Sequence, residues 1–479
     1  MIGRKKEIAE LNRIYNRKKA ELVAVYGRRR VGKTYLVDSV FKGKIVFKHA
    51  GLSPLELKDI SGKSQLQKQL KHFYNSLIMQ GMKKSKCPED WLDAFLMLQQ
   101  FMESKDKGQR MVIFLDELPW LDTAKSGFIT AFEGFWNNWA CHKDNIMVVV
   151  CGSATTWIID NLINNHGGLY NRVTYEIKLS PFDLGECEQY FKQEKVKLSK
   201  YDIVSSYMIV GGIPYYLSYF EPGRSLPQIV DQLFFNPGAK LRDEYDRLFT
   251  SIFNNPDIMK SIIDVLSKKN CGYTRDDISK ITGYGTGGNL TKALKALIAS
   301  DFVEKYVPFG MSKRQEHYKL IDPFCIFYNR FVKNHSRLNA SFWMQSHTSA
   351  GITAWRGLAF ENVCFAHIKQ IKTALGISGI NTEQFAWSKR EDDTEGTQID
   401  MIIKRSDHVV NMCEMKYYSS LCSVNKKYHS VLTNRQGFLE EKLPARYVIQ
   451  NVLITTNGLK YNEYSGFFDN VIVIDALFG

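Results

Sequence analysis

Residues 27–34, which read GRRRVGKT, constrain the fold of this 479-residue chain more than any other segment. They fit the pattern G-x-x-x-x-G-K-[ST] and follow the apolar run Glu21–Tyr26, a predicted strand. The residues from Gly32 to Phe41 continue as a predicted helix. Glycines between a strand and a helix let backbone N–H groups close around phosphate oxygens. The segment therefore predicts a phosphate-binding loop, and a glycine turn before an unrelated helix is the disfavoured alternative.

The chemistry of the loop follows from its residue types. Lys33 is predicted to place an ammonium group at the β- and γ-phosphate oxygens, and the Thr34 hydroxyl is predicted to bind Mg²⁺. The remaining predicted nucleotide contacts are Gly27, Arg28, Arg29, Arg30, Val31, Gly32 and Tyr35.

Further apolar runs surround the loop in the sequence. Besides Glu21–Tyr26, the predicted strands are 44–49, Met111–Leu115, Ile146–Cys151 and Arg172–Leu179, and helical patterns cover 64–80 and 88–103. Continuous apolar strands that alternate with helices are typical of a parallel sheet covered on both faces. The predicted fold class of the N-terminal part is therefore α/β.

Two adjacent carboxylates follow the strand Met111–Leu115. Asp116 is predicted to support Mg²⁺ through a water molecule, and Glu117 to polarise the water that attacks a phosphate. A pair of this kind suits hydrolysis better than nucleotide switching alone. The competing interpretation is that Asp116 and Glu117 only begin the next helix.

Two more polar residues have alternatives that stay open. Ser153, which follows the strand Ile146–Cys151, either senses the γ-phosphate or is a plain turn residue. Arg172 is either an arginine finger that acts on a neighbouring copy or an ordinary surface arginine. A ring or dimer of this chain follows from the first interpretation of Arg172.

Four segments, VYGRRRVGKT, FLDELPWL, GLYNR and GGIPYYL, resemble the archaeal-type ATPase family. That family belongs to the P-loop ATPases with an added catalytic glutamate, close to the AAA+ and STAND groups. The resemblance covers about residues 1–220 and implies ATP as the nucleotide. It also implies that Gly211, Gly212 and Pro214 lie in a lid helix near the nucleotide. The run Leu118-Pro119-Trp120 departs from the more hydrophobic or glutamine-rich run of many members.

The middle of the chain predicts a second architecture. Helical patterns at 256–268, 275–282 and 287–299 precede strand-like segments at 302–307 and 317–320, which is a winged-helix pattern. Lys292 and Lys295 are predicted to be exposed on the third helix. Because residues 256–330 carry only twelve Lys or Arg against eight Asp or Glu, contact with double-stranded DNA and a purely structural role both stay open.

Near the C-terminus, Glu414-Met415-Lys416 has the E-x-K form of a PD-(D/E)XK nuclease core. Side chains two apart on a strand share a face, so Glu414 and Lys416 project together. If the preceding hairpin is centred on Asp407, Asp400 pairs directly with Glu414. Two opposed carboxylates repel unless a cation lies between them, and Mg²⁺ suits such an oxygen site. The set predicts metal-assisted hydrolysis with Asp400 and Glu414 as ligands and Lys416 as a catalytic residue.

A third carboxylate belongs to the same prediction. Glu361 falls on the apolar stripe of Leu358 and Phe365, where a carboxylate needs a partner. Residues 350–479 resemble the restriction-endonuclease-like domain that is often fused to these ATPases, and a helix in that superfamily commonly supplies such a glutamate. The motif's proline-aspartate is Ile399-Asp400 here. The alternatives are a salt-bridged edge residue for Glu361 and an inactive arrangement for the whole set.

Composition limits the remaining possibilities. The formal charge is +14 at pH 7 and the pI is about 9.1, which is compatible with nucleotides or nucleic acid. Residues 1–50 hold fourteen Lys or Arg and four Asp or Glu, so much of the excess lies near the loop. Nine dispersed cysteines favour a reduced cytoplasmic protein. No apolar run predicts a membrane span.

The predicted architecture is a P-loop parallel sheet (1–182), a helical lid (183–250), a winged helix (255–335) and an α/β restriction-endonuclease-like domain (350–479). The predicted function is ATP and Mg²⁺ binding with ATP hydrolysis, coupled to a DNA-binding or nuclease-like module. The alternative is a non-cleaving, ATP-dependent switch that binds DNA or protein.

Overall fold

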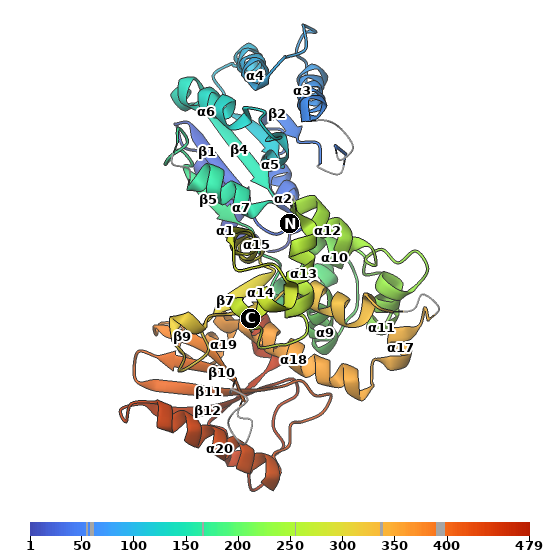
Figure 1. The fold of residues 1–479 in the computed structure, drawn as a ribbon, viewed down its shortest axis with the longest axis vertical. Coiled ribbons are helices and arrows are strands. Elements are labelled where there is room, and N and C mark those ends of the chain that lie inside the picture. The colour runs from blue at the N-terminus through green and yellow to red at the C-terminus, as the bar shows by residue number, and fades with distance from the viewer. Residues whose placement is uncertain (54–55, 58–61, 165–166, 254, 336–338, 389–397) are drawn as a thin grey trace. The chain divides into compact units, whose positions relative to one another are not determined.

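The computed structural model describes residues 1–479 except 54–55, 58–61, 165–166, 254, 336–338 and 389–397 (Figure 1). By its internal contacts the chain divides into two units. The first unit contains residues 1–181, 246–259 and 295–301, and the second contains 182–245, 260–294 and 302–479.

The first unit is built on a five-stranded parallel sheet within the described residues. Its strand order is β2 (Ile45–Ala50), β3 (Met111–Asp116), β4 (Ile146–Gly152), β1 (Glu21–Tyr26) and β5 (Tyr175–Lys178). Every residue of β1, β3 and β4 is buried, as expected for a sheet with helices on both faces. The predicted α/β class is confirmed for this part of the chain.

The strand order has a direct consequence for the site. Because β4 lies between β1 and β3, the residues that follow these three strands meet at one edge of the sheet. The α-helices within residues 1–181 are α1 (Lys5–Tyr15), α2 (Lys33–Val40), α3 (Gly62–Met79), α4 (Trp91–Lys105), α5 (Leu118–Leu121), α6 (Phe128–Asn138) and α7 (Thr155–Ile158). The first unit also includes most of α12 (Glu244–Ile252).

The second unit begins with a helical segment and continues into a small sheet. The first helices are α8 (Leu184–Gln193), α9 (Lys200–Val210), α10 (Pro214–Leu217) and α11 (Leu226–Val230). The predicted winged-helix elements are α13 (Pro256–Leu266), α14 (Arg275–Thr282) and α15 (Gly288–Ala299), with the sheet order β6 (Tyr273–Thr274), β8 (His317–Leu320) and β7 (Val303–Tyr306). The start of α13 and the end of α15 are assigned to the first unit and the other elements to the second. These elements lie close to their predicted positions, and the winged-helix assignment stays a prediction.

The C-terminal part of the second unit contains a mixed sheet. Its order is β13 (Asn470–Val473), β12 (Val448–Thr455), β11 (Val409–Lys416), β10 (Gln398–Arg405) and β9 (Thr382–Ser388). The pairs β9–β10 and β10–β11 are antiparallel, and the pairs β11–β12 and β12–β13 are parallel. The helix α20 (Lys426–Lys442) is the crossover connection from β11 to β12. The helices α18 (Ala350–Ala366) and α19 (Ile368–Ala374) precede the sheet, and α18 packs on β11 (Figure 1).

The predicted lid helices group with this C-terminal part. Helix α9 packs against α18 and against α16 (Pro323–Phe327), and α8 packs against the C-terminal turn Ile474–Phe478. Gly212, which follows α9, allows the chain to pass close to Phe182: the backbone N–H of Phe182 donates to the Gly212 carbonyl at 2.7 Å.

No helix in the described part of the chain combines the length and hydropathy that a membrane crossing requires.

Replacing Gly212 with alanine is expected to destabilise the second unit, because a Cβ there would lie 1.8 Å from the Phe182 carbonyl oxygen. Overpacking of this kind costs roughly 1–3 kcal/mol in unfolding free energy. The midpoint of urea unfolding measures the effect. Gly357→Ala is the matched control, because nothing lies within 4 Å of a Cβ at that position. Equal midpoints for the two variants would contradict the role given to Gly212.

Candidate functional site

The phosphate-binding loop joins β1 to α2 in a conformation that needs its glycines. Gly27 has φ 134°, and a Cβ at this position would lie 2.4 Å from the Leu179 carbonyl oxygen. Gly32 has φ 93° and precedes the first residue of α2. The first backbone N–H groups of a helix lack partners within the helix, so this junction favours an anion.

The Lys33 side chain is buried at the centre of the loop. It is 5% exposed, and its ammonium group lies 3.0 Å from each of three acceptors, the carbonyls of Gly27 and Arg28 and the hydroxyl of Ser153. Three donors therefore meet three acceptors. Burial is the main cause that lowers the pKa of Lys33, while the charge of Glu117 opposes it.

The acidic pair after β3 contacts both the loop and the end of β4. The Thr34 hydroxyl donates to Asp116 Oδ2 at 2.7 Å. Both Glu117 oxygens accept hydrogen bonds from Ser153, one from its backbone N–H at 2.9 Å and one from its hydroxyl at 2.6 Å. Burial first, and the Glu117 charge second, raise the pKa of Asp116. Thr34 and Asp116 are the residues of this site that could hold Mg²⁺.

Two glycines leave room for the start of α5, where Glu117 lies. Glu117 has φ 44°, a left-handed conformation that begins α5. A Cβ at Gly152 would lie 2.8 Å from Pro119 Cδ, and one at Gly51 would lie 3.0 Å from Trp120 Cβ. The link between Ser153 and Glu117 has no signal in the sequence, because only the strand order brings the ends of β4 and β3 together.

The other predicted nucleotide contacts differ in exposure. Arg28 and Val31 are buried, Arg29 and Arg30 are partly buried, and Tyr35 is exposed. The Arg29 guanidinium lies 5.6 Å from the centre of the Trp120 ring.

Arg172 is exposed in a turn of the first unit, where its backbone N–H donates to the Leu169 carbonyl at 3.0 Å. Its role as an arginine finger stays a prediction.

The second predicted site lies at the hairpin of β10 and β11. Met401 lies opposite Cys413 and Lys404 opposite Val410, which is the register of a hairpin centred on Asp407. The predicted register is therefore confirmed. Asp400, next to Met401, accepts a hydrogen bond from the backbone N–H of Met415 at 2.9 Å.

Protein cations compensate the charges of this hairpin. The Lys416 ammonium lies 2.5 Å from Glu414 Oε1 and 3.8 Å from Asp400 Oδ2. On α20, the Arg435 guanidinium lies 2.6 Å from Glu414 Oε2, and the Tyr428 hydroxyl donates to Glu414 Oε1 at 2.7 Å. Lys416 and Arg435 thus offset the negative charge of Asp400 and Glu414, which in the sequence was the reason to expect Mg²⁺.

Arg435 and Tyr428 were missed by the sequence analysis, although a signal existed. Tyr428, Leu432, Arg435 and Leu439 are spaced four, three and four residues apart, which places them on one face of a helix. The two leucines of this face are fully buried. A cation on an apolar stripe needs a partner for the same reason as Glu361 does.

Glu361 joins this cluster from α18. It is 8% exposed, and Asn270 donates to its Oε2 at 2.8 Å. Burial first, and the charge of Asp400 second, raise the pKa of Glu361 to about 8, while the charge of Lys319 lowers it. Burial and the charge of Glu414 raise the pKa of Asp400 to about 6.

The role of Asp400 and Glu414 as metal ligands stays a prediction. Across the described residues, no three Asp, Glu, His or Cys side chains are grouped so that they could hold a metal ion.

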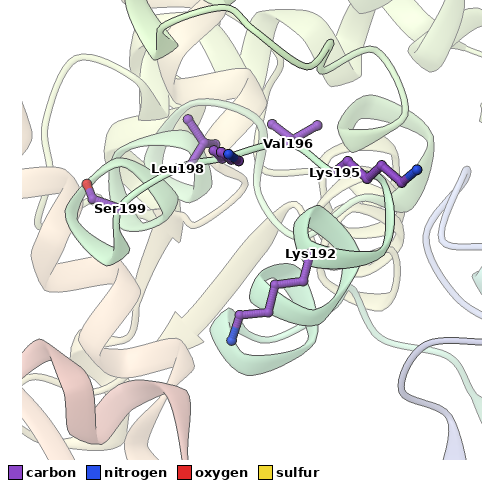
Figure 2. Close-up of a pocket in the computed structure, with 6 residues that line it drawn as sticks. Lys192, Lys195, Val196, Leu198 and Ser199 are labelled. Carbon is purple, nitrogen blue, oxygen red and sulfur yellow. The ribbon is translucent and has the colours of Figure 1, made fainter.

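Two other regions bear on binding. On α15, Lys292 and Lys295 are both exposed as predicted, and the Lys295 ammonium lies 2.8 Å from Asp160 Oδ1. Figure 2 shows a pocket at the connection of α8 and α9, and its lining residues belong to neither predicted site: Lys192, Lys195, Val196, Lys197, Leu198 and Ser199.

The parallel sheet, the glycine loop with its buried lysine and the paired carboxylates define an ATPase domain of the P-loop class. Residues 1–220 match the family model of the ATPase domain predominantly from Archaea. This part of the chain therefore contains an archaeal-type ATPase domain, as the resemblance implied.

Two proteins of Methanocaldococcus jannaschii are similar in sequence. "Uncharacterized protein MJECL04" is 26% identical over 372 residues, which are 76% of this chain and 76% of that protein. "Uncharacterized ATP-binding protein MJ0423" is 46% identical over 43 residues, which are 9% of this chain and 73% of that protein.

Two solved structures are similar in part. The Walker-type ATPase PABY2304 of Pyrococcus abyssi has a TM-score of 0.47 at 17% identity and covers 69% of this chain and 96% of its own. The ORC2 protein of Aeropyrum pernix, in complexes with ADPNP and ADP, has a TM-score of 0.39 at 12% identity and covers 72% of this chain and 95% of its own.

The C-terminal cluster predicts a pH dependence of stability. The pKa of Glu361 is about 8 in the folded protein, against an ordinary value of 4.5. Between these values the folded protein keeps a proton that the unfolded chain has lost, so the free energy of unfolding falls as pH rises. Glu361 alone contributes a slope of at most about 1.4 kcal/mol per pH unit.

Glu361→Gln is expected to reduce the fall in the free energy of unfolding with rising pH. The midpoint of urea unfolding, measured in EDTA at steps across the same pH range, gives the effect. Glu441→Gln, at an exposed position of α20, is the control and is expected to keep the wild-type slope. A wild-type midpoint that rises across the range would contradict the sign.

Proposed function

We propose that this protein binds ATP with Mg²⁺ and hydrolyses the β–γ phosphoanhydride. The single observation that carries the proposal is the convergence of Lys33, Thr34 with Asp116, and Glu117 with Ser153 at one edge of the parallel sheet. Such a set provides phosphate binding, metal binding and activation of water within one small volume.

The residues present fit a nucleotide with its metal. The positive φ values of Gly27 and Gly32 and the start of α2 suit a phosphate chain. The Lys33 ammonium would stabilise the transferred phosphate, and the Thr34 hydroxyl with Asp116 would hold Mg²⁺. When bound, Mg²⁺ neutralises charge on the phosphate oxygens.

Glu117 is the proposed residue that orients and polarises the attacking water. Its two hydrogen bonds from Ser153 fix the direction of the carboxylate. This supports a role for Ser153 in the site, in place of the plain turn residue. Arg172 is retained as a proposed arginine finger that acts on a neighbouring copy, and the protein would then be an oligomer.

A second candidate function is hydrolysis of a nucleic-acid phosphodiester in the second unit. The observation that favours it is the confirmed hairpin register, which brings Asp400, Glu414 and Lys416 together beside Glu361. The nuclease-like fold and the winged-helix contact with double-stranded DNA are part of this proposal.

One observation supports the non-cleaving alternative. Both Glu414 oxygens are engaged by Arg435, Lys416 and Tyr428, so a metal ion would compete with existing partners. In that case the second unit is a switch that responds to ATP without cutting.

Lys33→Ala is expected to abolish saturable ATP binding, because it removes the ammonium group from the loop. Glu117→Gln is expected to retain binding and to slow turnover about a hundredfold or more. Nucleotide titration and phosphate release measure the two effects. Glu89→Gln, which changes an exposed surface ion pair with Lys86, is the control. Turnover that survives both substitutions would remove the proposal.

If the cluster cleaves nucleic acid, Glu414→Ala is expected to lose plasmid nicking in Mg²⁺ or Mn²⁺ while ATP turnover remains. Glu440→Ala is the matched control, because Glu440 and Lys442 have the same E-x-K spacing at exposed positions of α20. If the wild-type protein cuts no DNA or RNA under any nucleotide condition, the switch alternative replaces cleavage.

A further inference from the structure

The small sheet of β6, β8 and β7 packs against the C-terminal part of the second unit. Phe309, in the connection from β7 to β8, donates its backbone N–H to the Ala386 carbonyl of β9 at 3.2 Å. The centre of the Phe309 ring lies 5.4 Å from that of Phe385 and 6.2 Å from that of Trp387. Because β9 lies at one end of the strand order, this connection covers an edge of the C-terminal sheet. The small sheet therefore has a fixed place beside the C-terminal sheet.

Asn270 reaches from the small sheet to the carboxylate cluster. It lies in the turn between α13 and β6, and its side-chain amide donates to Glu361 Oε2 at 2.8 Å. The turn is held closely against β8: a Cβ at Gly272, which has φ 71°, would lie 2.0 Å from the Tyr318 carbonyl oxygen. The position of the Asn270 amide is therefore set by the small sheet.

Lys319 brings a buried cation to the same carboxylate. It lies in β8 opposite Glu304 of β7 and is 7% exposed. Its ammonium lies 5.5 Å from the centre of the Phe365 ring, and Phe365 follows Glu361 by about one turn of α18. Burial lowers the pKa of Lys319, and the charge of Glu361 is the first of those that oppose this shift. A buried ammonium needs negative charge nearby, so Lys319 and Glu361 stabilise each other's charged forms.

The carboxylate cluster thus faces more positive charge than the C-terminal part alone provides. Lys416 and Arg435 contact Glu414, and Lys319 adds a third cation on the side of Glu361. A divalent cation gains most from carboxylates whose charge is not already compensated, and each protein cation nearby repels it. Lys319 therefore weakens the attraction of the cluster for a metal ion.

We propose that Lys319 and Asn270 belong to the C-terminal site and keep divalent cations out of it, with the Lys319 ammonium taking the place of a metal ion beside Glu361. The small sheet then decides whether Asp400 and Glu414 can act as metal ligands, and removal of the Lys319 charge opens the cluster to a metal ion. This inference rests on the proposed metal-ligand role of these two carboxylates and is independent of ATP hydrolysis in the first unit.

Binding of Mn²⁺ to the full-length, nucleotide-free protein tests the proposal, with the electron paramagnetic resonance signal of free Mn²⁺ as the measurement. Lys319→Met keeps most of the length of the side chain and removes its charge. It is expected to raise the affinity for Mn²⁺ roughly tenfold or more, because one unit charge no longer repels a divalent cation in the protein interior. Asn270→Ala frees one oxygen of Glu361 and is expected to give a smaller gain.

Two further variants locate the effect. Lys305→Met is the matched control, because Lys305 lies in β7 of the same sheet, is exposed and pairs with Glu316 at 3.0 Å. It changes the net charge by the same amount and is expected to keep the wild-type affinity. Glu414→Ala, added to Lys319→Met, is expected to remove the gained binding, which places the metal ion at the carboxylate cluster. If Lys319→Met does not fold, the gain in Asn270→Ala decides the same question.

The outcomes are distinct. Wild-type protein that binds Mn²⁺ as tightly as the Lys319→Met variant, with binding lost in Glu414→Ala, would overturn the inference and leave the metal-ligand role in place. If no variant binds Mn²⁺ through Glu414, the inference and the metal-ligand role both fall. Nucleotide titration and phosphate release still decide the function of the first unit in either case.

Discussion

The buried ammonium of Lys33 is the interaction on which the first unit's chemistry depends. A lysine that is 5% exposed must satisfy its charge and its three donors inside the protein. It does so with two loop carbonyls and with Ser153, whose hydroxyl donates in turn to Glu117. The phosphate loop, the end of β4 and the proposed water-activating carboxylate are therefore parts of one hydrogen-bonded chain.

The C-terminal cluster carries the opposite charge, because several of its buried side chains are carboxylates. Lys416 and Arg435 balance Asp400 and Glu414, and the raised pKa of Glu361 favours its neutral form. A cluster that is already balanced has less need of a metal ion than an uncompensated one. This balance is what makes cleavage and switching competing interpretations of the same residues.

The helices α8 and α9 are held by the C-terminal part of the chain. The segment predicted as a lid for the nucleotide belongs, by its contacts, to the unit that holds the carboxylate cluster. Tyr417 links α9 of that segment to the residue after the E-x-K motif.

Local spacing along the chain was enough to predict several features of the fold. The glycine loop, the buried strands and the hairpin centred on Asp407 follow from motif spacing, apolar runs and a turn, all within short stretches of chain. Contacts between residues far apart in the chain depend on the packed fold. The order of the strands brings Ser153 to Glu117, the docking of α20 brings Arg435 to Glu414, and the packing of α9 brings Tyr201 to Tyr417. Periodicity reports which face of an element is buried, but the partner on that face is set by the packing of the whole core.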